Sequence, residues 1–126
     1  MSKLESEIQQ LILIEASKHN IKLWRNNSGA LKDATGRLVR YGLGNTSEQI
    51  NKELKTSDLI GITPFMINGI VTGIFTAIEC KKEGWVFNPN DAREKAQLNY
   101  INAVISRGGI AGFASSVDEF LKIVRR

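Results

Sequence analysis

The 126-residue chain is 42% hydrophobic and 24% charged, which is ordinary for a globular protein, and we expect one domain over residues 1–126. No apolar run approaches the roughly 20 residues of a membrane span, the start is no signal peptide, and one cysteine with one histidine excludes an internal disulfide and a zinc site. The net charge of +4 favours a polyanionic partner such as nucleic acid, and we expect a reducing, intracellular setting without membrane contact.

The first predicted element is a helix that begins near Leu4, because Ser2 and Glu5 have the spacing of a capping box. Its expected buried face consists of apolar residues that recur at helical spacing: Leu4, Ile8, Leu11, Ile12 and Ala16. Glu7 lies at the margin of this face. From the residues alone, Glu7 is simply a solvated carboxylate near a helix N-terminus.

A first strand is predicted over residues 21–25, and two short runs, 30–32 and 37–41, can pair as a ribbon around a turn. Basic and aromatic side chains crowd this region: Trp24, Arg25, Lys32, Arg37, Arg40 and Tyr41. Such interleaving suits backbone phosphates and unstacked bases, but a solvated hairpin with one packed tryptophan explains it equally well. Residues 42–56 predict an irregular connection that contains one or two helical turns.

The most informative stretch is the predicted strand 75–81, which is rich in aromatic and β-branched residues. Because side chains alternate along a strand, Glu79 and Lys81 lie on one side and Cys80 on the other. Ionised groups are rarely buried without compensation, and a metal ion beside a phosphate would provide it. An edge-strand salt bridge is the alternative explanation.

A second carboxylate is predicted to reach the same place. Asp58 begins a short apolar strand, 59–63, and the turn signal Asn68-Gly69 leads back toward strand 75–81, with Gly73 offering a further bend. Two strands joined in this way are antiparallel neighbours, so that the start of one lies beside the end of the other. Asp58 is therefore expected next to Glu79 and Lys81.

The C-terminal part predicts a helix over 91–107 that Asp91 caps, a strand over 110–114 reached by a parallel crossover, and a terminal helix that Ser116 caps. Gln97 lies near the apolar face of the first of these helices, so its amide is expected to point toward the sheet or just beside it. The expected order is α-β-β-β-α-β-α, a mixed β-sheet flanked by helices in an α/β fold.

This order, with an acid followed by Glu-x-Lys on the next strand, resembles the PD-(D/E)XK nuclease superfamily. It most resembles the superfamily's virus-type replication-repair nuclease (VRR-Nuc) domain in its small, stand-alone phage and bacterial form. The similarity spans most of the chain and is carried by these residues: Glu7 with Gln9, 25–29, 57–61, 77–81, Gln97, 108–109 and 114–116. Ser57 replaces the proline of the superfamily's Pro-Asp, and the VRR-Nuc branch commonly has a small residue there.

The resemblance implies a restriction-endonuclease-like fold and an Mg²⁺- or Mn²⁺-dependent endodeoxyribonuclease. The expected catalytic residues are Asp58, Glu79, Lys81, Glu7 and Gln97. Asp58 and Glu79 supply oxygen ligands suited to these ions, the Cys80 backbone carbonyl is a plausible third ligand, and Glu7 can bind the metal through water. Lys81 would hold the attacking water and the phosphate.

The resemblance also implies a homodimer that acts on branched DNA, like a Holliday-junction resolvase, in the cytoplasm of a bacterial or phage-infected cell. The expected DNA contacts are Arg25, Asn27, Lys32, Arg37, Arg40 and Lys82. Apolar candidates for the dimer surface, each of which could instead be core, are Ile62, Phe65, Met66, Ile67 and Ile70. The alternative function is a catalytically weak DNA-binding or scaffold module of a replication or repair complex.

Overall fold

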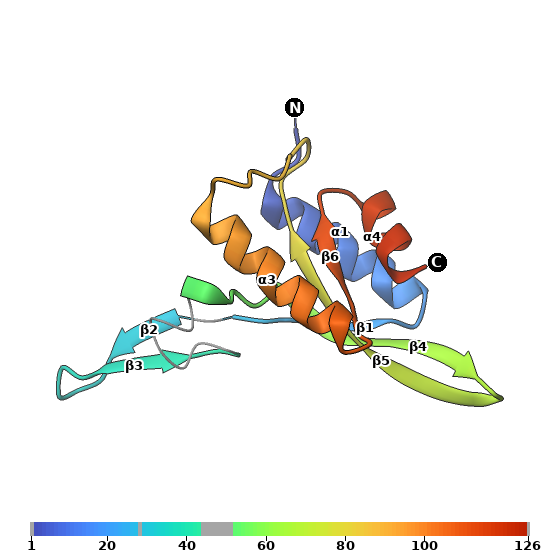
Figure 1. Ribbon diagram of the computed structural model, residues 1–126, viewed down its shortest axis with the longest axis horizontal. Helices are drawn as coiled ribbons and strands as arrows, with labels where there is room; N and C mark the ends of the chain where they lie inside the picture. The colour runs from blue at the N-terminus through green and yellow to red at the C-terminus, as the bar shows by residue number, and fades with distance from the viewer. Residues whose placement is uncertain (1, 28, 44–51, 126) are drawn as a thin grey trace.

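The computed structural model describes residues 2–27, 29–43 and 52–125, and these residues form a mixed α/β fold, as predicted (Figure 1). The three long helices are α1 (Glu5–Lys18), α3 (Ala92–Ser106) and α4 (Val117–Val124). A four-stranded sheet has the order β1-β4-β5-β6, with bounds β1 (Lys22–Arg25), β4 (Leu59–Ile67), β5 (Ile70–Cys80) and β6 (Ile110–Ala114). A separate two-stranded ribbon pairs β2 (Gly29–Lys32) with β3 (Leu38–Tyr41).

The strand directions follow the connections in the sequence. β4 and β5 are antiparallel and joined at Asn68-Gly69, where both residues have the positive φ that a tight hairpin requires (49° and 77°). β5 and β6 are parallel, because α3 carries the chain back across the sheet. The register pairs Leu59 with Ile78, so the start of β4 lies beside the end of β5, as predicted.

The hairpin of β4 and β5 is longer than the sequence suggested, and the bend predicted at Gly73 is wrong. Gly73 lies inside β5, where a Cβ atom would come within 2.7 Å of the Ile62 side chain. The glycine therefore accommodates a neighbouring side chain and does not turn the chain. The outer half of this hairpin projects from one end of the molecule, and the β2–β3 ribbon projects from the opposite end (Figure 1).

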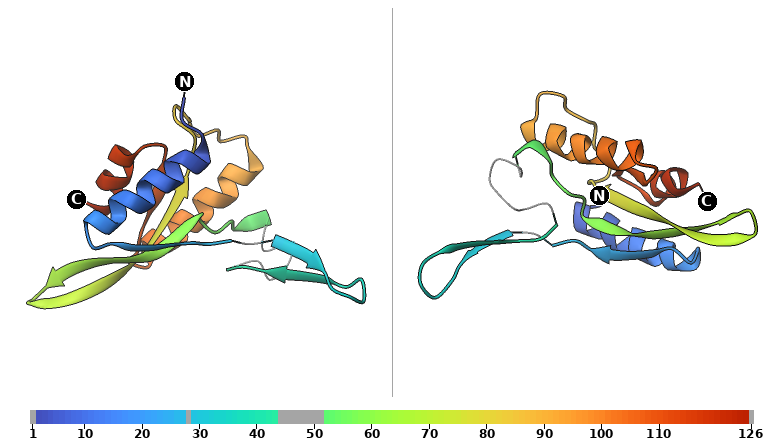
Figure 2. Two further views of the ribbon diagram at one scale, coloured as in Figure 1. Left: turned by 180° about the vertical axis from the view of Figure 1, so that it is seen from behind. Right: turned by 60° about the horizontal axis from the view of Figure 1, so that its bottom comes forward.

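The sheet separates two layers of helices (Figure 2). Helices α1 and α4 contact each other and pack on one face, with a core formed mainly by Ile8, Ile12, Leu59, Ile78, Cys80, Phe120 and Val124. Helix α3 covers the other face through its buried residues Ala96, Gln97 and Ile101. Because side chains alternate along β5, Ile78 and Cys80 enter the first layer and Glu79 faces the second.

Helix α1 begins at Glu5, in agreement with the predicted start near Leu4, but its cap differs from the prediction. Leu4 occupies the N-cap position without a side-chain hydrogen bond, and both Leu4 and Leu11 are exposed, so the capping box of Ser2 with Glu5 is wrong. The other two predicted caps are confirmed: the side chain of Asp91 accepts the Glu94 amide at the start of α3, and that of Ser116 does the equivalent in α4. Among the described residues, no helix has both the length and the apolar character to span a membrane.

Candidate functional site

Three carboxylates from different elements meet at one end of the sheet. Glu5 begins α1, Asp58 immediately precedes β4, and Glu79 lies near the end of β5. One oxygen of each lies within 4.8 Å of the others. Glu79 is only 2% exposed, while the Glu5 side chain remains open to solvent. This cluster, Glu5–Asp58–Glu79, joins the two predicted acids with a third that the sequence did not indicate.

Backbone contacts hold Asp58 in place. Its carboxylate accepts a 3.0 Å hydrogen bond from the Cys80 amide, and its carbonyl accepts one of 2.7 Å from the Asn26 amide. The Asn26 side chain also donates to the carbonyl of Ser57 at 2.9 Å. The loop after β1 therefore fixes the residues that lead into β4. One Asp58 oxygen is oriented by β5, beside Glu79.

Bringing these carboxylates together makes their ionised forms unfavourable. Burial raises the pKa of Glu79 to about 9, and the negative charges of Asp58 and Glu5 act in the same direction, while Lys81 opposes them. Partial burial, followed by the Asp58 charge, also raises the pKa of Glu5. At neutral pH, Glu79 therefore keeps its proton unless a positive charge replaces it.

A metal ion is the positive charge that this donor set fits. The three groups supply hard oxygen ligands from separate elements, and a cation would displace the proton and relieve the repulsion between the acids. The cluster can therefore hold a metal ion. The contribution of the Cys80 carbonyl stays a prediction.

The side chain of Cys80 has no part in this chemistry. It is fully buried in the core between the sheet and α1. Burial, followed by the nearby carboxylates, raises the pKa of the thiol, so it remains protonated. As predicted, the residue packs through its side chain, and its amide binds Asp58.

Lys81 is held by its surroundings. Its ammonium donates a 2.7 Å hydrogen bond to Oε1 of Gln97 in α3, and both side chains are buried. It also lies 5.4 Å from the centre of the Trp85 ring and 5.7 Å from that of Phe113, distances typical of cation–π contacts. The Gln97 amide points toward the sheet, as its helical position predicted, and its partner there is Lys81. The aromatic pair was not anticipated.

The structure corrects the position of the acid in α1. Glu7 is exposed and lies outside the carboxylate cluster, where Glu5 takes the place expected for it. Two residues along a helix correspond to a rotation of about 200°, so only one of these side chains can face the sheet end. Glu7 was expected in the site because the resemblance implies it, and the residues alone gave no reason to choose it over Glu5.

The residues predicted to contact DNA are spread over several surfaces. Lys32, Arg37 and Arg40 lie on the projecting β2–β3 ribbon, with exposed Tyr41 beside them. Arg25 instead donates to the Gln10 side chain of α1 at 2.9 Å. Asn27 is exposed in the loop after β1.

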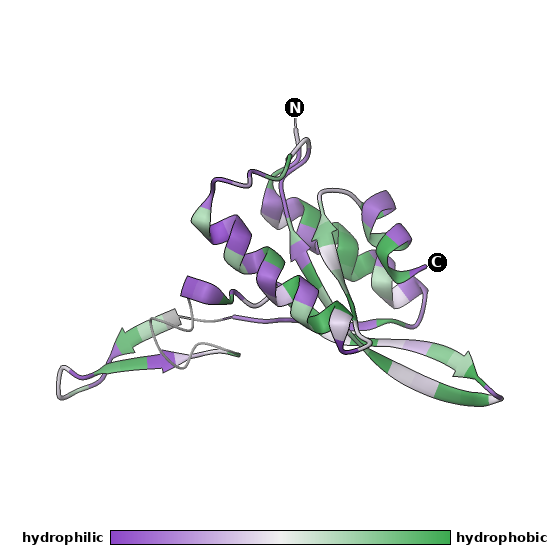
Figure 3. Ribbon diagram, viewed as in Figure 1, coloured by the Kyte–Doolittle hydropathy of each residue, from purple (hydrophilic) through white to green (hydrophobic). Residues whose placement is uncertain are grey.

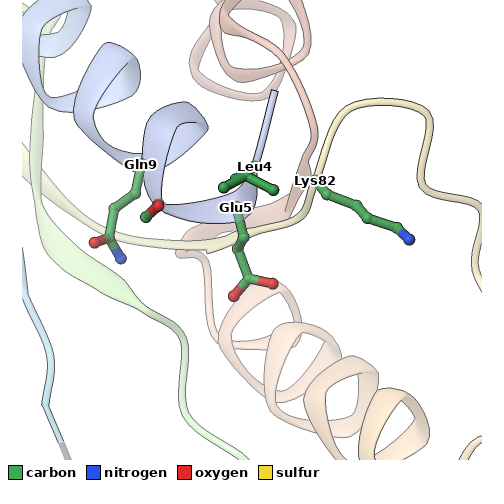
Figure 4. A pocket seen from close by; sticks show the side chains of 5 residues that line it. Leu4, Glu5, Gln9 and Lys82 are labelled. Carbon is green, nitrogen blue, oxygen red and sulfur yellow. The ribbon is translucent and has the colours of Figure 1, made fainter. Parts of the chain in front are cut away.

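Lys82 lines a cavity beside the carboxylate cluster. The cavity has a volume of about 520 Å³ and is lined by Leu4, Glu5, Ser6, Gln9 and Lys82. Figure 4 shows the Glu5 carboxylate extending from the first turn of α1 toward α3, while the Lys82 side chain extends away from it. The cavity gives solvent and ligands access to the Glu5 side of the cluster.

Comparison of the chain with protein-family models, with curated proteins and with solved structures gives no match.

Proposed function

We propose that the protein is a metal-dependent endonuclease that hydrolyses phosphodiester bonds in branched DNA, as its resemblance to the VRR-Nuc domain implies. The observation that carries this proposal is the Glu5–Asp58–Glu79 cluster beside Lys81. Acids that can hold a cation, next to a fixed ammonium, suit the hydrolysis of a phosphate diester, because both positive charges would stabilise the negative charge that develops on the phosphate.

The donor set favours Mg²⁺ or Mn²⁺, since both prefer carboxylate oxygens and retain bound water. When bound, such an ion would lower the pKa of a water molecule and offset the negative charge of the phosphate. Asp58 and Glu79 would be its ligands, and Glu5 would bind it directly or through water.

Lys81 has a separate role in this proposal. Its ammonium would lie against the scissile phosphate and hold the attacking water, so that its charge partly offsets the charge that develops during the reaction. Gln97 would keep the ammonium in position, because it accepts one of its three protons. The Trp85 and Phe113 rings would limit the movement of the lysine side chain.

The shape of the molecule supports a branched substrate. The β2–β3 ribbon carries Lys32, Arg37 and Arg40 away from the body, where their charges can reach phosphates at a distance from the cluster (Figure 1). Because phosphate contacts do not distinguish one base sequence from another, recognition should depend on the shape of the DNA. The affinity for DNA should fall steeply with salt concentration.

The second copy in the proposed homodimer would bind at the outer half of the β4–β5 hairpin, residues 63–75, which we term the apolar arm. Beyond Ile62 and before Thr76, the two strands pair only with each other in the described sheet. Residues 59–78 contain no charged side chain, and much of the arm is apolar and exposed (Figure 3). An uncharged surface of this kind does not suit DNA, whereas the same arm of a second copy matches it.

The function is tested by incubating the purified protein with supercoiled and four-way DNA in Mn²⁺, Ca²⁺ or EDTA. We expect cleavage in Mn²⁺, binding with little cleavage in Ca²⁺, and no cleavage in EDTA, because Ca²⁺ takes a looser, higher coordination. Binding without cleavage in Mn²⁺ would instead indicate a DNA-binding or scaffold module.

A second experiment tests the substrate. Competition binding at fixed salt should favour four-way DNA over linear duplex, and Arg37→Ala or Arg40→Ala should weaken binding without changing the affinity for metal. Equal affinity for four-way DNA and linear duplex would contradict a junction resolvase, while the proposal of a nuclease would stand.

A further inference from the structure

Two basic residues that the proposed mechanism does not use, Lys55 and Arg93, lie at the first turns of α3, the helix that contacts Lys81 through Gln97. Arg93 is in the first turn of α3, one turn before Gln97, and residues four apart lie on the same face of a helix. Because Gln97 contacts Lys81, Arg93 lies on the side of α3 that faces the cluster.

Lys55 reaches the same place from another element. Its amide donates a 3.1 Å hydrogen bond to the carbonyl of Ala96, which fixes the segment before β4 against α3. The Asn99 side chain fixes the same segment by donating to the carbonyl of Glu53 at 3.0 Å. Ala96 lies three residues after Arg93, so the hydrogen bond to its carbonyl holds Lys55 beside the turn of α3 that carries Arg93. In agreement, burial lowers the pKa of Lys55, and the positive charge of Arg93 lowers it further.

Within the part of the chain that the structure describes, neither cation is paired with a carboxylate. Among the described residues, neither the Lys55 ammonium nor the Arg93 guanidinium forms a salt bridge. Two like charges held together by the backbone repel each other, and an anion between them would turn the repulsion into attraction. The guanidinium offers a planar pair of donors and the ammonium a compact charge, a combination that suits the oxygens of a phosphate.

We propose that Lys55 and Arg93 bind a backbone phosphate of the DNA strand next to the phosphate that is cleaved. The pair lies on the α3 side of the cluster, so a strand that places one phosphate at Lys81 can place a neighbouring one between Lys55 and Arg93. The pair would thereby fix the register of the strand over the carboxylates. This inference rests on the proposed function, since it assigns the phosphate to the nucleic acid substrate.

The test measures binding of a labelled four-way DNA in Ca²⁺, where cleavage is suppressed, over a range of salt concentrations. Arg93→Gln and Lys55→Gln should each weaken binding by about tenfold, as expected for one charge-assisted hydrogen bond. Each should also reduce the slope of log affinity against log salt by about one unit. The double variant should lose less than the product of the two single losses, because both residues would hold the same phosphate.

Lys95→Gln is the matched control. Lys95 is exposed on the same helix, but two residues from Arg93 it points about 200° away. The control should bind DNA like the wild type. Thermal unfolding and Mn²⁺ titration should show that all variants are folded and bind metal at least as well as the wild type, since either substitution at the pair removes a repulsion.

The outcomes separate this inference from the nuclease proposal. If the wild type cleaves DNA and both variants keep its affinity and salt slope, the proposed phosphate site is wrong and the nuclease proposal stands. The same conclusion follows if the wild type cleaves DNA and Lys95→Gln loses as much affinity as the two variants. If the wild type binds without cleaving in Mn²⁺ and both variants are weakened, the phosphate site holds and the nuclease is wrong. A wild type that does not bind DNA contradicts both.

Discussion

The Lys81 ammonium donates a 2.7 Å hydrogen bond to Oε1 of Gln97, which ties the end of β5 to the middle of α3. The two side chains are 8% and 3% exposed, so each is the other's partner in a region with little water. Removing the amide would leave the lysine buried beside two aromatic rings with less to orient it. Gln97 is therefore a positioning residue for Lys81.

Gln97→Leu should reduce the rate of cleavage by about 10- to 100-fold, the usual loss when a supporting hydrogen bond near a metal site is removed. The loss should appear in kcat, with the affinity for Mn²⁺ unchanged, because Gln97 is outside the carboxylate cluster. Asn102→Leu, on an exposed position of the same helix, is the control. Wild-type kcat in Gln97→Leu would contradict the positioning role.

The proximity of Asp58 and Glu79 could be predicted, because an antiparallel hairpin with a clear turn signal leaves few possible registers. The direction of the Gln97 amide could also be predicted, since the helical period placed it toward the sheet, whereas its role beside Lys81 or the phosphate came only from the resemblance. Both predictions depend on local periodicity and on one tight turn. The structure confirms both.

Other parts of the site depend on tertiary structure that no local pattern fixes. Whether Glu5 or Glu7 faces the end of the sheet is decided by how α1 packs on the sheet through Ile8 and Ile12, and this packing places Glu5 in the cluster. The path of the segment that contains Lys55 depends on hydrogen bonds to Ala96 and Asn99 of α3, which lie far away in the sequence. The bend predicted at Gly73 was wrong for a similar reason: a glycine in a strand can allow close packing of a neighbouring side chain as well as a bend.

The structure places Glu5 in the carboxylate cluster, where Glu7 was expected, and this difference leads to a pair of predictions. Glu5→Gln should weaken Mn²⁺ binding and slow cleavage, because it removes one of the three carboxylates of the cluster. Glu7→Gln removes the same charge from an exposed position of the same helix turn and should change neither. Isothermal titration with Mn²⁺ measures both variants. Equal losses of Mn²⁺ affinity in the two variants would mean that Mn²⁺ binding depends on the overall charge of α1 and not on the position of Glu5.

The raised pKa of Glu79 predicts how pH affects the metal-free protein. A carboxyl whose pKa is higher in the folded state stabilises the fold fully below its ordinary pKa of 4.5, and this contribution is lost as the pH rises toward the folded value. In EDTA, the free energy of unfolding should therefore decrease between about pH 5 and pH 9. Glu79→Gln should flatten the decrease, as urea unfolding at several pH values can show.

The same proton links metal binding to pH. Since Glu79 is protonated near neutral pH, Mn²⁺ must displace a proton, and the affinity for Mn²⁺ should increase with pH. Titration in two buffers with different ionisation enthalpies measures the number of protons released. Release that is undiminished in Glu79→Gln would show that the proton comes from another group.

The apolar arm predicts the oligomeric state. Met66→Lys places a charge on a residue that is 68% exposed, and it should convert a dimer into a monomer, because a charge is costly to bury in an apolar interface. Leu31→Lys, on the β2–β3 ribbon at 65% exposure, is the matched control and should leave the dimer intact. Light scattering after size-exclusion chromatography gives the mass of each. A wild-type monomer, or a dimer unaffected by Met66→Lys, would contradict the assignment of the arm.

The carboxylate cluster is tested most directly by cleavage of end-labelled four-way DNA in Mn²⁺, comparing the wild type with Glu79→Gln. The substitution keeps the shape of the side chain and removes the repulsion among the acids, so the fold should survive. We predict that the wild type cuts the DNA, and that Glu79→Gln binds it in Ca²⁺ but does not cut it in Mn²⁺. Cleavage by Glu79→Gln at the rate of the wild type would contradict a metal-dependent nuclease site at this cluster.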